Sequence, residues 1–374
     1  MGDPRPRRLQ ALKDGLTAAH LDALLVTGAA NVRYLSGFSG SSAMLLVTVR
    51  DTLLISDFRY QTQAADEVGE LARVVIEPQS LWNGLWQQLG QLASVETIGF
   101  ESTHMVHRDF QRLLEAGARW QWRPTVEQVE VLRERKDEGE LALIQQAVDA
   151  AERALAAMVE GTREGMTELE VAGLLELSLR REGSDGFAFP SIVASGPNAA
   201  LPHARPTSRC LRSGDFLLVD FGARIGGYCS DITRTFVMGS ATAEQREFYD
   251  VVRSANELAV KAVRPGMTGR DADGVARGYI EDRGFGDLFG HSLGHGIGLE
   301  VHESPRLART AEGPLVQGAV VTVSMLAETM GMASSIPRVK RARVETCRRE
   351  RMLERRGTSR TSSKVRARRG WSVM

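Results

Sequence analysis

The chain has 374 residues, of which 43% are hydrophobic and 25% are charged, with a formal net charge of zero. These proportions are ordinary for a globular protein, and they exclude a collagen-like chain, a disulfide-rich scaffold and a chain that is disordered throughout. At about 150 residues per domain, the length predicts two or three domains.

No apolar run approaches the roughly 18 residues that a membrane span requires. The N-terminal stretch MGDPRPRRLQALKDG has charges where a signal peptide would have its apolar core. The three cysteines, Cys210, Cys229 and Cys347, form no metal-type pair, and three is an odd number for a disulfide framework. We therefore expect a cytoplasmic protein with no membrane partner.

The neutral net charge hides two different segments. From Arg338 to the C-terminus there are 14 Lys and Arg residues against 3 Asp and Glu, a balance of +11, whereas the preceding 337 residues carry −11. An acidic body argues against nucleic acid as the main partner. Residues 324–374 also have few apolar positions and no sustained period, so we expect a basic and poorly ordered tail.

The first segment predicts a small α/β domain over residues 1–128. Leu9, Leu12 and Leu16 recur at helical spacing. Short apolar runs bounded by turn-forming residues predict strands at 21–28, 42–49, 51–56, 72–78 and 95–102. The stretch from 122 to 140 then becomes polar and charged, and it marks the domain boundary.

Residues 129–323 predict an α+β domain in which a pattern occurs twice. A helix over 141–161 is followed by one capped by Thr167 and Glu170, and strands follow up to about residue 237. Thr242 and Gln245 cap a third helix, and a fourth runs over about 270–284. Two helices and then strands, twice over, predict two similar halves packed face to face.

Two aspartates lie in the predicted hairpin DFLLVDFGARIGGYCSDITRTFVMG. If the turn centres on Ile225-Gly226, Asp220 and Asp231 face each other directly across the hairpin, with Cβ atoms about 5 Å apart. Two like charges so placed repel each other, unless a cation or a shared proton lies between them. The alternatives are an exposed edge hairpin or a different register.

Histidines gather in the segment HSLGHGIGLEVHE. Glycines at 294, 296 and 298 leave the backbone beside His295 almost bare, which allows close approach of a ligand or a strand. His291 and His302 flank it, and histidine is the commonest protein ligand of transition metals. His203 lies in the loop GPNAALPHARP before the hairpin, where a solvated loop histidine is the simpler interpretation.

Together, VDFGARIGGYCSDITRTF, FGHSLGHGIGLEVHESP and LPHARP resemble the pita-bread metallopeptidases, in particular the Xaa-Pro dipeptidase (prolidase) and aminopeptidase P branch. The resemblance extends to about Val323. It implies a creatinase-type N-terminal α/β domain and a pita-bread (creatinase/aminopeptidase-like) α+β catalytic domain.

The resemblance also implies a site and a substrate. Asp220, Asp231 and His295 would be ligands of two divalent metal ions, and His203, His291 and His302 would line the substrate pocket. Such ions acidify bound water and polarise a peptide carbonyl. Oxygen ligands with one imidazole suit Mn²⁺, with Co²⁺ or Zn²⁺ as alternatives. The expected substrate is a small peptide with proline at its second position, and the expected assembly is a homodimer.

The chain departs from the family pattern after VVTV. A Glu-Pro-Gly is expected there, and a second glutamate is expected on a later strand, both as metal ligands. Here Ser324 follows, Glu328 comes four residues late, and Glu345 lies in a setting that only loosely matches; neither glutamate is assigned as a ligand.

We hypothesise that a reading-frame shift near codon 324 replaced the family's last strands, and that this chain therefore binds metal weakly. Resequencing the gene across that codon tests the idea, and an uninterrupted frame in several isolates would refute it. A basic arm for phosphates is the alternative, but an added arm would not replace core strands.

Three other functions fit the same residues less directly. Aminopeptidase P-type removal of the first residue from longer Xaa-Pro peptides would use the same site. A catalytically inactive pita-bread binding protein is favoured by the missing glutamates but does not need the retained aspartates and histidines. Creatine hydrolysis on this fold would use no metal, and the paired aspartates argue against it.

Overall fold

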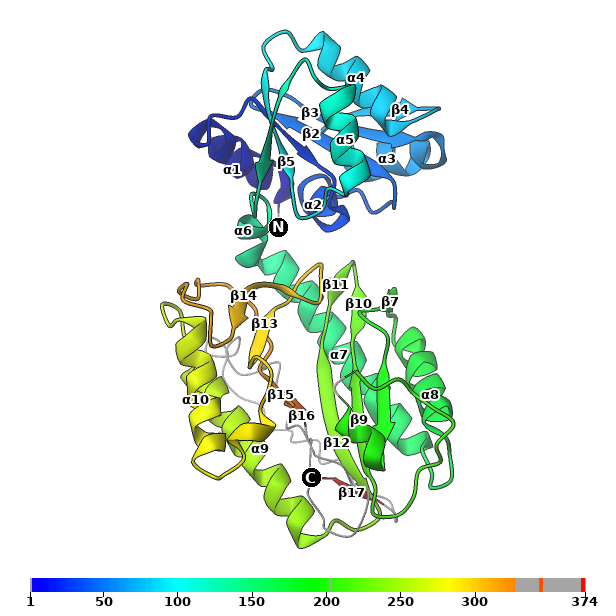
Figure 1. Ribbon diagram of the computed structural model, residues 1–374. Helices are drawn as coiled ribbons and strands as arrows, with labels where there is room; N and C mark the ends of the chain where they lie inside the picture. Colours follow the sequence, from blue (N-terminus) through cyan, green and yellow to red (C-terminus); the bar gives the residue numbers. More distant parts are fainter. Residues whose placement is uncertain (1, 202, 327–342, 346–370, 374) are drawn as a thin grey trace. The chain divides into compact units, whose positions relative to one another are not determined.

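The computed structural model describes residues 2–201, 203–326, 343–345 and 371–373 (Figure 1). The chain divides into two compact units, Met1–Arg133 and Glu134–Met374. The predicted boundary near residue 128 falls just before this division. Within the described residues, no helix combines the length and the apolar character of a membrane span.

Unit 1 is built on a six-stranded sheet with the order β4-β3-β2-β1-β5-β6. Its strands are β1 (Ala23–Val26), β2 (Ala43–Thr48), β3 (Thr52–Asp57), β4 (Arg73–Glu77), β5 (Thr97–Glu101) and β6 (Gln121–Thr125). The five predicted strands are all present. β6 was not predicted because it is an edge strand with mostly exposed side chains and a proline, which only an edge tolerates.

The helices of unit 1 include the predicted one, which buries Leu9, Leu12 and Leu16. They are α1 (Arg5–Ala18), α2 (Ala29–Ser36), the 3₁₀ helix η1 (Phe58–Tyr60), α3 (Gln61–Val68), α4 (Leu81–Gln91) and α5 (His107–Glu115), with α6 (Glu130–Glu134) at the division between the units. Strands β3 and β4 are parallel, as are β5 and β6. Parallel neighbours need a crossover, and α3 and α5 lie in these two connections.

Unit 2 contains the four predicted helices, α7 (Glu138–Gly161), α8 (Glu168–Arg181), α9 (Ala243–Ala262) and α10 (Gly269–Glu281). Both predicted capping boxes form: Thr167 with Glu170, and Thr242 with Gln245. In each box the side chains satisfy backbone N–H groups that have no partner within the helix. A third box, Asp137 with Glu140, starts α7.

The described strands of unit 2 form four sheets, with the orders β17-β12-β9-β8, β11-β10-β7, β13-β14 and β15-β16. They are β7 (Gly186–Phe187), β8 (Ile192–Ser195), β9 (Phe216–Phe221), β10 (Ala223–Ile225), β11 (Tyr228–Cys229), β12 (Ile232–Met238), β13 (Gly294–Gly296), β14 (Glu303–Leu307), β15 (Ser324–Leu326), β16 (Arg343–Glu345) and β17 (Trp371–Val373), with 3₁₀ helices η2 (Gly196–Ala200) and η3 (Gly286–Leu288).

The helices of unit 2 pack in two pairs (Figure 1). Apolar side chains of α7 and α8 form one core with Leu217, Val219 and Phe221 of β9 and with β12. Side chains of α9 and α10 form a separate core with Leu293, just before β13, and Leu307 of β14. Each helix pair thus covers its own strands, as predicted for a domain of two α+β halves.

The predicted register of the aspartate hairpin is wrong. Asp220 lies opposite Thr233 rather than Asp231, because the turn residues are Gly226 and Gly227. Both glycines have positive φ, 56° and 86°, which two-residue hairpin turns of type I′ require. Asp231 precedes Thr233 by two residues, so the alternation of side chains places it on the face of Asp220 as a diagonal neighbour.

Part of the predicted tail is described. β15 pairs with β16, with Ser324 opposite Glu345, and β17 pairs with β12, with Val373 opposite Phe236. The remainder of that prediction, Glu328 included, concerns residues outside the described ranges.

Unit 2 contains a buried ion pair between Lys136 and the first residue of β14, Glu303. Lys136 Nζ lies 2.8 Å from Glu303 Oε2, and the two side chains are 1% and 5% exposed. The Lys136 backbone N–H also donates to Gly318 O, at 3.1 Å. Because both charges are out of water, removing one leaves the other unpaired in a poorly solvating environment.

We predict that Lys136→Met lowers the free energy of unfolding by about 3–5 kcal/mol, measured by urea denaturation. Lys261→Met is the matched control, since Lys261 lies 4.0 Å from Glu257 with both side chains largely exposed, and it should change stability by less than about 1 kcal/mol. Adding Glu303→Gln to Lys136→Met should recover part of the loss. Equal effects of the two lysine substitutions would contradict the prediction.

Candidate functional site

Asp220 is held near the end of β9 by the residues around it. Val219 and Phe221 point into the α7–α8 core and are fully buried, which turns Asp220 to the other face of the sheet. Its side chain is 3% exposed, and its Oδ1 accepts a hydrogen bond of 2.7 Å from Thr233 Oγ1 on the neighbouring strand. The sheet register therefore fixes the direction of this carboxylate.

Asp231, at the residue preceding β12, is 4% exposed. Its Oδ1 is buried and has no hydrogen-bond partner among the described residues, and its Oδ2 lies 3.4 Å from Nε2 of His295. A buried acceptor without a donor costs about 1–3 kcal/mol, and more when it is charged. This carboxylate therefore lies where a cation would be stabilising.

His295 lies on β13 and presents Nε2 to Asp231. Its Nδ1 is 2.9 Å from the carbonyl oxygen of Gly296, which can only accept, so Nδ1 carries the proton. In the neutral ring Nε2 is then an acceptor, aimed at a second acceptor. A metal ion between the two atoms removes this conflict, and a backbone carbonyl bonded to the other ring nitrogen is the usual support of a metal-binding histidine. Asp231 and His295 thus fit a divalent metal.

Glycines allow β13 to lie where it does. A Cβ at Gly294 would be 2.0 Å from Thr322 O, and a Cβ at Gly296 would be 2.1 Å from Ser304 O. The bare backbone predicted around His295 therefore serves close approach by neighbouring backbone segments, one of the two possibilities left open.

The other predicted site residues lie at different depths. His302 is exposed, and its ring centroid is 4.4 Å from that of His295. His291 is half-buried against Phe289, with centroids 5.0 Å apart. His203 is exposed in the connection between β8 and β9. The structure therefore places His295 beside both Asp231 and His302.

One positioning pair was not predicted. Asp273 and Arg277 form a buried ion pair on α10, and Arg277 donates to the carbonyl oxygens of Phe289 and His291. Asp273 Oδ1 accepts from Leu293 N, at 3.1 Å. The pair therefore fixes the backbone that leads into His295. Its signal was an oppositely charged i,i+4 pair on an otherwise small and apolar helix face.

Cys229 is not a candidate nucleophile. Burial raises the pKa of its thiol to about 12, and its Sγ lies 3.8 Å from Leu299 O. The thiolate, which is the reactive form, is therefore absent at neutral pH.

A second cluster lies in unit 1. Glu101, His104 and Glu130 are the one group among the described residues with three potential ligand atoms all within 4.8 Å. Asn31 Nδ2 donates to both carboxylates, at 2.6 and 2.7 Å, and Arg133 donates to Asn31 Oδ1, which fixes the amide in that orientation. The cluster is thus an internally bonded network and does not fit a metal.

The potential ligand atoms of Asp220, Asp231 and His295 do not all lie within 4.8 Å of one another. Three ligands of a single ion would have to be that close, but ligands shared between two ions need not be. The ions of a two-metal centre are about 3.5–4 Å apart, so ligands of different ions can be more widely separated.

Comparison with known proteins agrees with this geometry. Residues 142–349 match the metallopeptidase family M24, and residues 8–135 match the creatinase/prolidase N-terminal domain. The Xaa-Pro dipeptidase of Pyrococcus furiosus is 34% identical over 318 residues, which are 84% of this chain and 89% of that protein. An uncharacterized peptidase of Bacillus subtilis, YqhT, is 36% identical over 316 residues, with the same coverage.

Solved structures show the same fold over both units. The Xaa-Pro dipeptidase from Bacillus anthracis has a TM-score of 0.85 and 33% identity, and the match covers 91% of this chain and 93% of that one. The X-Pro aminopeptidase from Thermotoga maritima has a TM-score of 0.82 and 36% identity, with 90% and 93% covered. The expected α/β N-terminal domain and pita-bread catalytic domain are confirmed, and the chain belongs to metallopeptidase family M24, a family of metal-dependent peptidases, in its Xaa-Pro dipeptidase and aminopeptidase P branch.

Proposed function

We propose that the chain hydrolyses Xaa-Pro dipeptides in a metal-dependent reaction. Xaa-Pro dipeptidases from two Pyrococcus species, 34% and 33% identical to this chain, support this substrate class. The observation that carries the proposal is the buried pair of acceptors, Asp231 Oδ2 and His295 Nε2, 3.4 Å apart.

Asp220, Asp231 and His295 would hold two divalent ions, Mn²⁺ preferred and Co²⁺ or Zn²⁺ as alternatives, because the donors are mostly carboxylate oxygens with one imidazole. When bound, such ions acidify water and polarise the scissile carbonyl. His203, His291 and His302 would line the substrate pocket. His302 and His203 would stabilise the transition state or hold the scissile carbonyl and the substrate carboxylate.

We further propose that this chain binds its metals weakly. The sequence that follows Val323 contains no Glu-Pro-Gly, so two glutamate ligands expected of the family have no counterpart among the assigned residues. A homodimer in the cytoplasm remains the expected state, and size-exclusion chromatography with light scattering would test the assembly.

The test measures bound metal and hydrolysis of Ala-Pro and Leu-Pro side by side, for this chain and for a version with the family's frame restored after residue 323. We expect little bound metal and low turnover from the 374-residue chain, and both restored in the corrected one. Two tightly held Mn²⁺ ions with full turnover from the present chain would refute weak binding. Tight metal binding without hydrolysis by either version would favour an inactive binding protein.

Aminopeptidase P-type activity is the second candidate, because the Thermotoga maritima X-Pro aminopeptidase matches this chain as well as the dipeptidases do. Comparison of Leu-Pro with a longer peptide such as Leu-Pro-Gly-Gly separates the two. A dipeptidase should prefer Leu-Pro; a higher kcat/KM for the longer peptide would favour the aminopeptidase.

We predict that Asp231→Asn is more stable than the wild type without metal and less stable than the wild type with Mn²⁺. In EDTA the asparagine Nδ2 can donate to His295 Nε2, so the variant should be more stable than the wild type by about 1–3 kcal/mol. With Mn²⁺ the order should invert, because a ligand has been lost and metal affinity should fall at least about 100-fold. Thermal unfolding with and without Mn²⁺, and titration calorimetry, measure these effects.

Asp250→Asn is the control for this experiment. Asp250 is exposed and bonds only to Arg253 on its own helix in the contacts described, at 2.9 Å. Its substitution should leave the metal dependence of stability unchanged. A destabilised Asp231→Asn protein in EDTA would show that the aspartate has a proton donor rather than a metal as its partner.

A further inference from the structure

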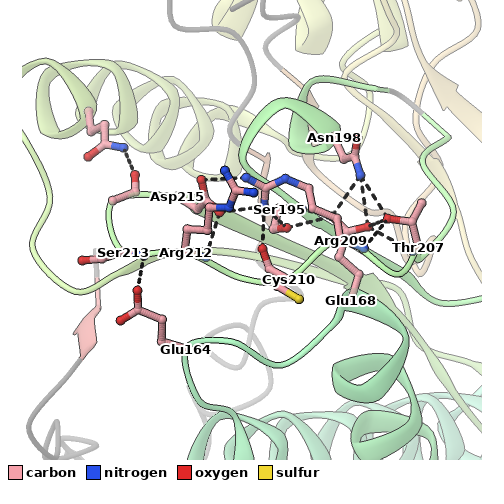
Figure 2. A network of polar contacts seen from close by, with 12 residues as sticks. Glu164, Glu168, Ser195, Asn198, Thr207, Arg209, Cys210, Arg212, Ser213 and Asp215 are labelled. Atoms are coloured by element: carbon pink, nitrogen blue, oxygen red, sulfur yellow. Dashed lines mark hydrogen bonds and ion pairs between the residues drawn. The ribbon is translucent and has the colours of Figure 1, made fainter.

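The connection that carries His203 is fixed at both ends by one side chain. We call residues 196–201 and 203–207 the His203 loop; it begins directly after β8. Glu168, the first residue of α8, is 0% exposed and lies against both ends of this loop (Figure 2).

The two carboxylate oxygens of Glu168 serve opposite ends of the loop. Oε1 accepts from Ser195 N at 2.7 Å and from Ser195 Oγ at 2.8 Å. Oε2 accepts from Thr207 N at 3.0 Å and from Thr207 Oγ1 at 2.7 Å. Asn198 Nδ2 donates to both oxygens, at 3.1 Å each. One carboxylate therefore joins the start of the loop to its end.

The middle of the loop packs against the sheet face that carries Asp220. Ala199 and Ala204 are buried in a small apolar cluster with Leu218 of β9. Leu218 and Asp220 are two residues apart on one strand, so their side chains share a face. His203, next to the seated Ala204, is thus held over the face that presents Asp220.

The charge of Glu168 is stabilised without a directly bound cation in the contacts described. The carboxylate lies at the N-terminus of α8, where the helix dipole favours negative charge. Arg209 Nη1 donates to Ser195 Oγ at 2.6 Å and pairs with Asp215 (Figure 2). Both oxygens of Glu168 accept hydrogen bonds. A glutamine in its place would present an NH₂ group, which cannot accept, to the donors at one end of the loop.

The geometry points to Glu168 as a positioning residue that fixes His203 for binding of the substrate. This inference rests on the proposed function, because it takes His203 as a substrate contact. Glu168 does not contact the substrate in this proposal; it holds the two ends of the loop together.

The test compares Glu168→Gln with Glu164→Gln as the matched control. Glu164 is exposed, and its Oε1 accepts from Ser213 N, outside the His203 loop. Hydrogen exchange followed by mass spectrometry should show exchange in the His203 loop about tenfold faster or more in Glu168→Gln, with β9 unchanged. Glu164→Gln should leave the loop unchanged. Unaltered loop exchange in Glu168→Gln would overturn the inference.

A double-mutant cycle with His203→Ala tests the link to the substrate. The probe is the reduced-amide analogue of Leu-Pro, which cannot be cleaved, titrated in the presence of Mn²⁺. We expect each single variant to raise Kd about tenfold and the double variant to match His203→Ala alone. Additive losses would mean that Glu168 acts independently of His203, and would overturn the inference.

The two readouts separate the inference from the proposed function. If neither this chain nor the version with the frame restored after residue 323 binds the analogue, the proposed substrate class is wrong, and loop exchange alone then decides whether Glu168 holds the two ends of the loop together.

Discussion

The site depends on one electrostatic conflict. Asp231 Oδ2 and His295 Nε2 are 3.4 Å apart, the carboxylate is almost fully buried, and the other nitrogen of the imidazole already donates its proton to a backbone carbonyl. Two acceptors in such a place are unfavourable unless a positive charge joins them. Oδ1 of the same carboxylate is also buried and has no hydrogen-bond partner within the described part of the chain. A divalent ion bound here would supply the positive charge that these atoms need.

The rest of unit 2 holds the two atoms in place. β9 and β12 turn one face to the apolar core under α7 and α8, which leaves the other face for Asp220 and Thr233. In the second half, β13 lies close to neighbouring backbone at Gly294 and Gly296, where an added Cβ would be 2.0 and 2.1 Å from a backbone oxygen. The Asp273–Arg277 pair then fixes the approach to His295. The centre is therefore assembled from both halves, and neither half contains it alone.

Local signals in the sequence predicted the local structure well. Thr167 and Thr242 cap their helices as expected, because a capping box involves only four residues. The hairpin was predicted but its register was not, because two adjacent glycines allow more than one turn centre, and only packing selects between them. The partner of Asp220 is two residues further along the chain than predicted, at Thr233 instead of Asp231. A shift of two residues keeps side chains on the same face of the sheet, so the two aspartates still share a face. Asp231 and His295 are separated in the sequence by both helices of the second pair, α9 and α10, so no local pattern predicts their contact. Only the resemblance to a family indicated that the two residues belong to one site.

The sequence departs from the family pattern after Val323, but the residues just before that point are folded into unit 2. Ser324 N still donates to Leu293 O, and Asn256 Nδ2 donates to Val323 O, so the last residues that follow the family pattern are fixed in the second core. The hydrogen bond from Thr233 to Asp220, the contact of Asp231 with His295 and the contact of His295 with Gly296 all involve residues before 324. If the proposed function is right, the glutamates missing after Val323 would lower the affinity for metal, whereas these contacts would still orient the three side chains. Ligand number and ligand orientation would then depend on different parts of the chain.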